Sequence, residues 1–287
     1  MTSGATLRFG YGTNGFGSHR LDDALAVIAR LGYDGVALTL DHHHLDPFDS
    51  DLAVHTAKVG RRLEELGLAV VVETGARYIL DPWRKHEPTL VSHGDRAPRV
   101  DLLRRAVVVA ADLGAEAVSF WSGTCPTGTD DKTAWARLCD GVSAVLAMAE
   151  EHEVTCAFEP EPGMFVDTLE AALELRRRLG EPELLKITLD LGHCVAVEPV
   201  PTEDVIGRAG PLLANVQADD MRRGVHEHLE FGDGELDLPA ALGALLNGGY
   251  AGLVAVELPR HGHAAPVVAE RSLAALRVAL SQAKEAR

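Results

Sequence analysis

Short apolar runs rich in β-branched residues alternate along the whole chain with longer stretches of helical periodicity. The apolar runs lie at 7–11, 35–40, 69–74, 117–121, 155–159, 186–190, 213–218 and 253–258. Helical periodicity fills 21–32, 51–67, 99–114, 131–152, 168–180, 202–210, 238–249 and 265–286. Several of the helical stretches end in Leu-Gly, which is typical of a left-handed C-cap. The alternation predicts repeated strand–helix units and a parallel sheet.

The number of units selects among parallel folds. A doubly wound open sheet would share the alternation but would not need eight units, and the segment GYGTNGFG after the first run lacks the GxGxxG spacing of a dinucleotide-binding turn. At 287 residues the chain fits a barrel of about 250 residues with added loops. We therefore predict an α/β fold with a single (β/α)₈ TIM barrel, as one domain over 1–287.

Charge and apolar patterning exclude several classes of partner. The formal net charge of −16 disfavours nucleic acid and anionic membranes, which attract Lys and Arg. No apolar run approaches the roughly 20 residues of a membrane span, and residues 1–10 lack a basic-then-apolar signal. The four cysteines form no CxxC pair, which fits a reducing compartment. We expect a cytoplasmic protein that binds neither nucleic acid nor membrane.

Four candidate metal ligands stand at or near the ends of the last four apolar runs: Glu159, Asp190, Gln217 and Glu257. In a parallel barrel the carboxyl ends of the strands meet at one rim. Oxygen ligands gathered at such a rim bind hard divalent cations. The spacing therefore predicts one metal site built from these four residues.

Glu159 and Glu257 are also the candidate catalytic residues. Each follows apolar residues that cannot solvate a charge, so each carboxylate must be paired, protonated or metal-bound. For Glu159 the alternative is a structural carboxylate bonded to a neighbouring loop, and Glu161, two residues further on, is a second candidate ligand. Two glutamates facing each other across a metal suit proton removal from a carbon and proton return, while the ion stabilises an enediolate.

Histidines offer a second, softer group of ligands. His193 follows Asp190 in a DxxH pair, and His226 and His228 form an HxH pair in the segment GVHEHLEFGDGELDL. Alternating histidines are a common metal-ligand arrangement, so the three imidazoles could form a second site suited to zinc. The alternative is that the HxH pair is simply exposed in a loop.

The motifs FEPEPG, LDLGH, GDGELD and VELPRHGH resemble the xylose isomerase-like TIM-barrel superfamily, which includes sugar phosphate isomerases and epimerases and is related to the apurinic endonucleases. The resemblance covers essentially the whole chain. It implies that Glu159, Asp190, Gln217 and Glu257 hold the ion, although relatives usually carry His where this chain has Gln217. An amide oxygen suits Mn²⁺ or Mg²⁺ better than zinc. The expected cofactor is Mn²⁺ or Zn²⁺, with Mg²⁺ as a further candidate.

The resemblance also implies roles in substrate binding. It implies that Glu159 and Glu257 act as acid/base partners, that His193 contacts substrate, and that Arg223 binds a substrate hydroxyl or carbonyl. Independently of the resemblance, Arg77 and Lys85 lie in the longest non-helical segment, 77–98, and are the candidate contacts for a substrate phosphate.

The leading hypothesis is a metal-dependent isomerase or epimerase that acts on a sugar, a sugar phosphate or a related polyol carbonyl compound. The HxH pair motivates a rival, a zinc-dependent hydrolase or phosphodiesterase of the endonuclease-like branch. The Gln217 departure motivates another, a non-catalytic metabolite-binding barrel. The expected partners are a small carbohydrate-like molecule and a second copy of the chain in a homodimer.

Overall fold

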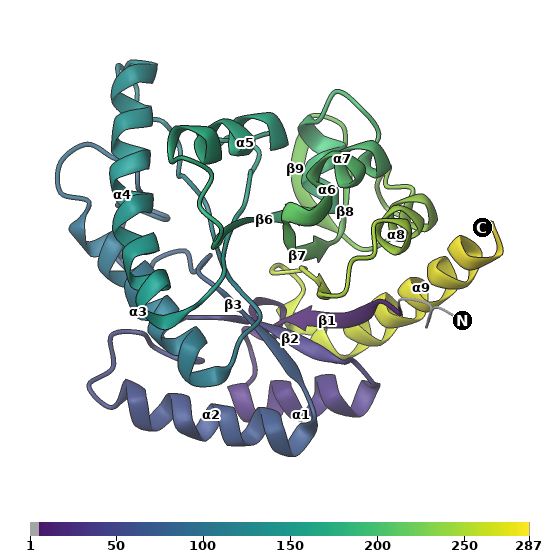
Figure 1. The fold of residues 1–287 in the computed structure, drawn as a ribbon. Helices are drawn as coiled ribbons and strands as arrows, with labels where there is room; N and C mark the ends of the chain where they lie inside the picture. The colour runs from purple at the N-terminus through teal and green to yellow at the C-terminus, as the bar shows by residue number, and fades with distance from the viewer. Residues whose placement is uncertain (1–5, 287) are drawn as a thin grey trace.

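The eight predicted apolar runs form the eight parallel strands of a closed barrel in the computed structural model, which describes residues 6–286 (Figure 1). The strands are β1 (Arg8–Gly12), β2 (Gly35–Thr39), β3 (Ala69–Glu73), β4 (Val118–Phe120), β5 (Cys156–Phe158), β6 (Leu185–Asp190), β7 (Leu213–Ala218) and β10 (Leu253–Val256). Each pairs with the next in this order, and β10 closes against β1. The predicted TIM barrel is therefore confirmed. Residues 1–5, part of the segment searched for a signal, lie outside the described residues, as does 287.

Helices cover the outside of the barrel (Figure 1). They are α1 (Leu21–Leu31), α2 (Leu52–Leu66), α3 (Ala97–Leu113), α4 (Asp131–His152), α5 (Leu169–Arg178), α6 (Leu191–Val197), α7 (Thr202–Ala209), α8 (Leu238–Asn247) and α9 (Ala265–Glu285). The first three end in a glycine of positive φ, as the Leu-Gly pairs predict. The short helix α6 was not predicted. Within residues 6–286 no helix is both long and apolar enough to cross a membrane.

The inner face of the barrel changes from apolar to polar toward the carboxyl ends of the strands. A small cluster of Val71, Ala117, Ala157 and Leu253 fills one level. Alternation along β3 places Glu73, two residues after Val71, on the same inner face. Its carboxylate accepts a hydrogen bond from Asn215 on β7, 3.0 Å away across the barrel. Polar side chains therefore occupy the level above the apolar cluster.

A two-stranded antiparallel hairpin projects between β7 and α8. It consists of β8 (Asp220–Arg222) and β9 (Val225–Leu229), which pair with each other and with no barrel strand. The turn between them holds Gly224, whose φ of 73° suits glycine. The segment was predicted as a loop, but β8 and β9 pair regularly as antiparallel strands.

Candidate metal centre and active site

A cavity of about 480 Å³ opens at the carboxyl ends of the barrel strands. Residues predicted for the site line much of it: Arg77, Lys85, Glu159, His193, Gln217, His226, His228 and Glu257. Asp190 is fully buried at the end of β6 and, although it does not line the cavity, lies next to His193, which does. Of the predicted site residues, Arg223 alone stands apart from this group.

Glu159, Asp190 and His193 come together at the ends of β5 and β6. The Asp190 carboxylate caps helix α6 by accepting a hydrogen bond of 2.8 Å from the backbone N–H of His193. The ring of His193 faces the end of β5, with its Nδ1 3.4 Å from Oε1 of Glu159. One ligand atom from each of the three residues lies within 4.8 Å of the others. The three groups are close enough to share one cation.

Gln217 and Glu257 lie on the neighbouring strands. Gln217 is in register with Asp190 on β6, and its amide oxygen is buried without a hydrogen-bond partner in residues 6–286. Glu257 directly follows β10, where its backbone N–H still bonds Ala218 of β7. Its carboxylate accepts a hydrogen bond of 2.9 Å from Asn14. The four predicted metal ligands therefore lie on four consecutive barrel strands or directly after them.

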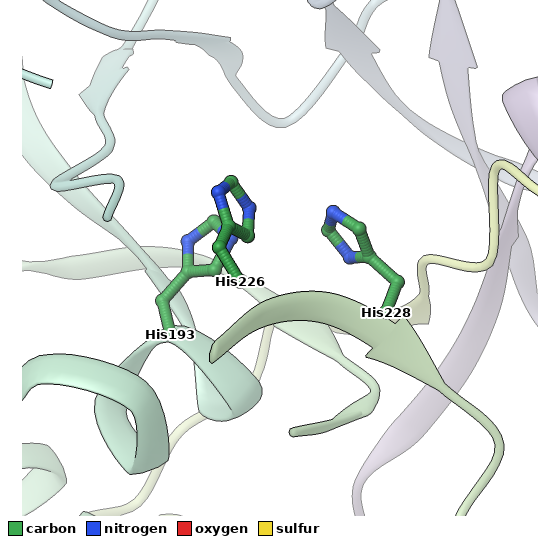
Figure 2. Close-up of side chains that lie close together, drawn as sticks. All are labelled: His193, His226 and His228. Carbon is green, nitrogen blue, oxygen red and sulfur yellow. The ribbon is translucent and has the colours of Figure 1, made fainter. Parts of the chain in front are cut away.

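The three predicted histidines form a compact cluster, which Figure 2 shows with His226 and His228 on the hairpin and His193 on α6. The ring centroid of His193 lies 4.9 Å from that of His226 and 5.7 Å from that of His228. One nitrogen from each ring lies within 4.8 Å of the other two. The hairpin therefore carries both of its histidines over the barrel mouth, beside the carboxylates.

Sequence reasoning missed Asp219 as a member of the site. Asp219 is fully buried, and its carboxylate is hydrogen-bonded to Nδ1 of His228. It forms a third group of ligand atoms within 4.8 Å together with Asp190 and His228. The signal was present, because positions 217 and 219 are two residues apart and extended chain places such residues on one face. Glu161, weighed only as an alternative ligand, also lines the cavity.

Burial and mutual repulsion raise the pKa values of the rim glutamates. Burial, followed by the nearby charges of Glu257 and Glu73, raises the pKa of Glu159 well above its ordinary value. Burial also raises the pKa of Glu257 to about 7, against the opposing effect of His228. Burial raises the pKa of Glu161 to about 7 as well. A concentration of carboxylates that resist ionisation indicates a place where a cation or a transferable proton belongs.

Asp190 and the histidines shift in the opposite direction. Burial alone would raise the pKa of Asp190, but His193, His228 and the capping N–H outweigh it, so its net pKa lies below the ordinary value. Burial lowers the pKa of His193 to about 3 and that of His226 to about 4, against the attraction of Asp190. These two imidazoles are therefore neutral near pH 7, which is the form that binds metal.

The predicted cationic contacts divide into two groups. Arg77 and Lys85 line the cavity at its exposed edge. Arg223 instead donates hydrogen bonds to the backbone carbonyls of Val195 and Glu198 in and after α6. Arg223 lies in the hairpin turn and is not among the residues that line the cavity. The structure does not bring Arg223 to the site.

The residues present fit a divalent cation. Asp190 Oδ2, Gln217 Oε1, Asp219 Oδ1 and both ring nitrogens of His193 are buried and make no hydrogen bond within residues 6–286. Buried lone pairs without a donor are costly unless another group satisfies them. Carboxylate, amide and imidazole donors together form a ligand set that suits Mn²⁺ or Zn²⁺.

The fold and this rim define a TIM-barrel protein with an acidic site at the carboxyl ends of its strands. The model of the xylose isomerase-like TIM barrel family matches residues 25–279, which is most of the chain. The protein belongs to this family, as the motifs of the sequence indicate.

Individual relatives are sugar epimerases. L-ribulose-5-phosphate 3-epimerase UlaE of Shigella flexneri serotype 5b (strain 8401) is 25% identical over 244 residues, which cover 82% of this chain and 81% of that protein. A solved structure of L-ribulose 3-epimerase has a TM-score of 0.78 at 19% identity and covers 98% of this chain and 96% of that one. The structure of IOLI protein with a binding zinc atom has a TM-score of 0.76 at 16% identity, with 96% and 99% coverage. Both structural matches show the likeness of fold.

Proposed function

We propose that this protein is a divalent-metal-dependent epimerase or isomerase of a small sugar, sugar phosphate or related polyol carbonyl compound. The observation that carries the proposal is the pair Glu159 and Glu257, two glutamates lining one cavity, each with a raised pKa. The activities named for relatives, 3-epimerisation of L-ribulose and of L-ribulose 5-phosphate, support the substrate class.

Glu159 and Glu257 are the proposed acid/base pair. One carboxylate removes the proton from the carbon next to a carbonyl group, and the other carboxyl group returns a proton to the opposite face, which inverts that carbon. A pKa of about 7 at Glu257 suits a group that both accepts and donates a proton near neutral pH. His193, buried beside Glu159, is the proposed contact for a substrate hydroxyl.

Glu159, Asp190, Gln217 and Glu257 are the proposed ligands of Mn²⁺ or Zn²⁺, and Mg²⁺ also fits this all-oxygen set. When bound, the cation would polarise the substrate carbonyl and thereby acidify the neighbouring C–H bond. The orphaned oxygens of Asp190 and Gln217 support this assignment. A second site at His193, His226 and His228, where three imidazole nitrogens favour zinc, belongs to the alternative candidate described below.

Deuterium exchange tests the activity directly. We expect the Mn²⁺-loaded protein in deuterated water to incorporate one deuterium at the carbon next to the carbonyl of a 2-ketopentose, a 2-ketohexose or a phosphate ester of one. Removing one acid/base group costs about 10²–10⁴ in rate, so Glu257→Gln should slow exchange by that factor. No exchange with any free or phosphorylated ketose would contradict the proposal.

The histidine cluster favours a second candidate, a zinc-dependent phosphodiesterase. Multinuclear metal sites clamp both the attacking and the leaving oxygen of a phosphate ester. Anomalous scattering from zinc-soaked crystals separates the candidates, because two or three neighbouring ions favour hydrolysis and one ion favours epimerisation. Hydrolysis of bis(p-nitrophenyl) phosphate by the zinc-loaded protein would be the matching activity.

A further inference from the structure

Asp219 is a buried carboxylate for which the proposed proton transfer has no use. It directly follows β7, and its surface is fully excluded from solvent. One carboxylate oxygen is hydrogen-bonded to Nδ1 of His228, whereas Oδ1 has no hydrogen-bond partner in residues 6–286. Burying such a group costs free energy unless neighbouring charges compensate it. We therefore look for a role of Asp219 in the site, because the packing of the barrel alone does not account for a buried carboxylate.

Helix α6 is built closely against this carboxylate. A Cβ added at Gly192 would overlap Oδ1 and Cγ of Asp219 and would also crowd Met221 of β8. Gly192 lies between Asp190, which caps α6, and His193. Asp219 is thus held between α6 on one side and the hairpin histidine on the other.

The contact with Asp219 determines which nitrogen of His228 remains free. A cation bound beside Asp219 favours the ionised carboxylate, which only accepts hydrogen bonds, so in the loaded site Nδ1 carries the hydrogen and Nε2 keeps its lone pair. His228 lines the cavity, and ligand atoms of His228, Asp219 and Asp190 lie within 4.8 Å of one another. A carboxylate partner on one imidazole nitrogen fixes the ring and makes the other nitrogen a stronger metal ligand.

We infer that Asp219 is a positioning residue that holds His228 as a nitrogen ligand of the cation bound by Asp190. The inference rests on the proposed function, because that proposal places the cation at Asp190. It adds an imidazole from the hairpin to a ligand set that otherwise consists of oxygens. It also removes His228 from the three-histidine group, so the protein holds one cation at this rim.

Mn²⁺ binding to the full-length protein without substrate tests the inference. Calorimetry should give one ion per chain, and pulsed EPR of the bound Mn²⁺ should show a nitrogen coupling that His228→Gln abolishes. Asp219→Asn should abolish or shift the same coupling and weaken Mn²⁺ binding by about 10–100-fold, the usual effect of losing such a partner.

Asp220→Asn is the matched control. Asp220 is the adjacent buried aspartate, but its carboxylate accepts hydrogen bonds from the backbone N–H groups of Gly232 and Leu236 and pairs with no imidazole among residues 6–286. This variant should keep both the nitrogen coupling and the Mn²⁺ affinity. Loss of the coupling in Asp220→Asn would show that any disturbance of the hairpin is sufficient, and would overturn the specific role of Asp219.

Other outcomes are equally decisive. A wild-type coupling in Asp219→Asn, whether or not the affinity falls, would overturn the inference, as would a wild-type protein that binds no Mn²⁺ or shows no nitrogen coupling. Because these measurements need no substrate, they are independent of deuterium exchange. The predicted couplings without any exchange would contradict the proposed function and leave the inference intact.

Discussion

At the residue scale, opposite charges occupy different levels of the cavity. The carboxylates of Glu159 and Glu257 lie at the strand ends, whereas Arg77 and Lys85 lie at the exposed edge. Neither cation makes a side-chain hydrogen bond or ion pair with residues 6–286, so both are available to a ligand. A sugar whose reacting carbon faces the glutamates would direct its far end toward these cations.

Neutralising these cations should weaken substrate binding and leave the chemistry intact. For a phosphorylated ketose we expect Arg77→Gln and Lys85→Gln each to raise KM by about 10-fold with kcat nearly unchanged, because a charge-assisted hydrogen bond contributes roughly 1.5–3 kcal/mol and these side chains are exposed. Arg84→Gln is the control, since Arg84 is in the same loop and pairs with Asp81. Steady-state kinetics with a ketose and its phosphate ester measure the effect. An equal increase in KM for the free ketose and for its phosphate ester would rule out a phosphate contact.

The spacing was sufficient to place Glu159, Asp190, Gln217 and Glu257 on one rim, because each stands at or near the end of an apolar run and a barrel brings such positions together. It was insufficient for Asp219, whose partner His228 depends on how the hairpin folds back. The sequence pattern also did not indicate where the Arg223 side chain lies, because Arg223 is in the two-residue turn of the hairpin and that turn has no periodic pattern.

At the element scale, the parts that sequence periodicity missed are the parts that complete the site. Helix α6 has only seven residues, fewer than two turns, so its apolar face gives no readable 3.6-residue repeat. Strand β8 has three residues. Helix α6 is capped by Asp190 and packs through Gly192 against Asp219, and Asp220 holds the loop that follows β9.

The packing of α6 against Asp219 predicts a large effect from a single methyl group. Gly192→Ala should lower the free energy of unfolding by about 1–3 kcal/mol, because its Cβ would overlap the Asp219 carboxylate. Gly207→Ala in α7 is the control: its Cβ meets no atom within 4 Å, so it should stabilise the protein by about 0.5–1 kcal/mol. Urea unfolding of both variants measures the difference. Equal effects at the two glycines would contradict the close approach.

At the scale of the whole molecule, the closed barrel was the most predictable feature, because eight apolar runs of similar length leave few other arrangements for the chain. The pattern did not indicate how strongly burial inside the closed barrel would shift the pKa values of the acidic side chains. Glu73, Glu159 and Asp219 all have a pKa raised well above the ordinary value by burial, with neighbouring carboxylates adding to the effect. Without a cation, we expect these buried carboxyl groups to lower the stability of the folded protein at neutral pH.

Removing one of these carboxyl groups should therefore increase the free energy of unfolding, and the increase should depend on pH. The pKa of Glu257 is raised from its ordinary 4.5 to about 7, so the folded protein holds this proton more tightly than the unfolded chain. The wild type therefore loses stability as pH rises from about 4.5 to 7, by at most about 1.4 kcal/mol per pH unit. Metal-free Glu257→Gln lacks this loss, so its stability relative to wild type should increase over the same range.

Thermal and urea unfolding at pH 5 and pH 8, with a chelator present, measure this difference. Saturating Mn²⁺ should reverse its sign at pH 8, because a bound cation favours the ionised wild-type carboxylate over the neutral amide. A difference that stays constant between pH 5 and pH 8 would contradict the raised pKa.

Because the β8–β9 hairpin does not pair with the barrel strands, the histidines offered to the cation and the hydrogen bonding of the barrel are determined by different segments. The barrel closes through β10 and β7 without any hydrogen bond from β8 or β9. Residues 225–229 carry both imidazoles and can be exchanged without a change in the strand register of the barrel, whereas Asp220 and Met221 of β8 are buried and hold the hairpin in place. Substitution of His226 or His228 in β9 would therefore alter the nitrogen donors at the rim and leave the hydrogen bonds of the barrel unchanged.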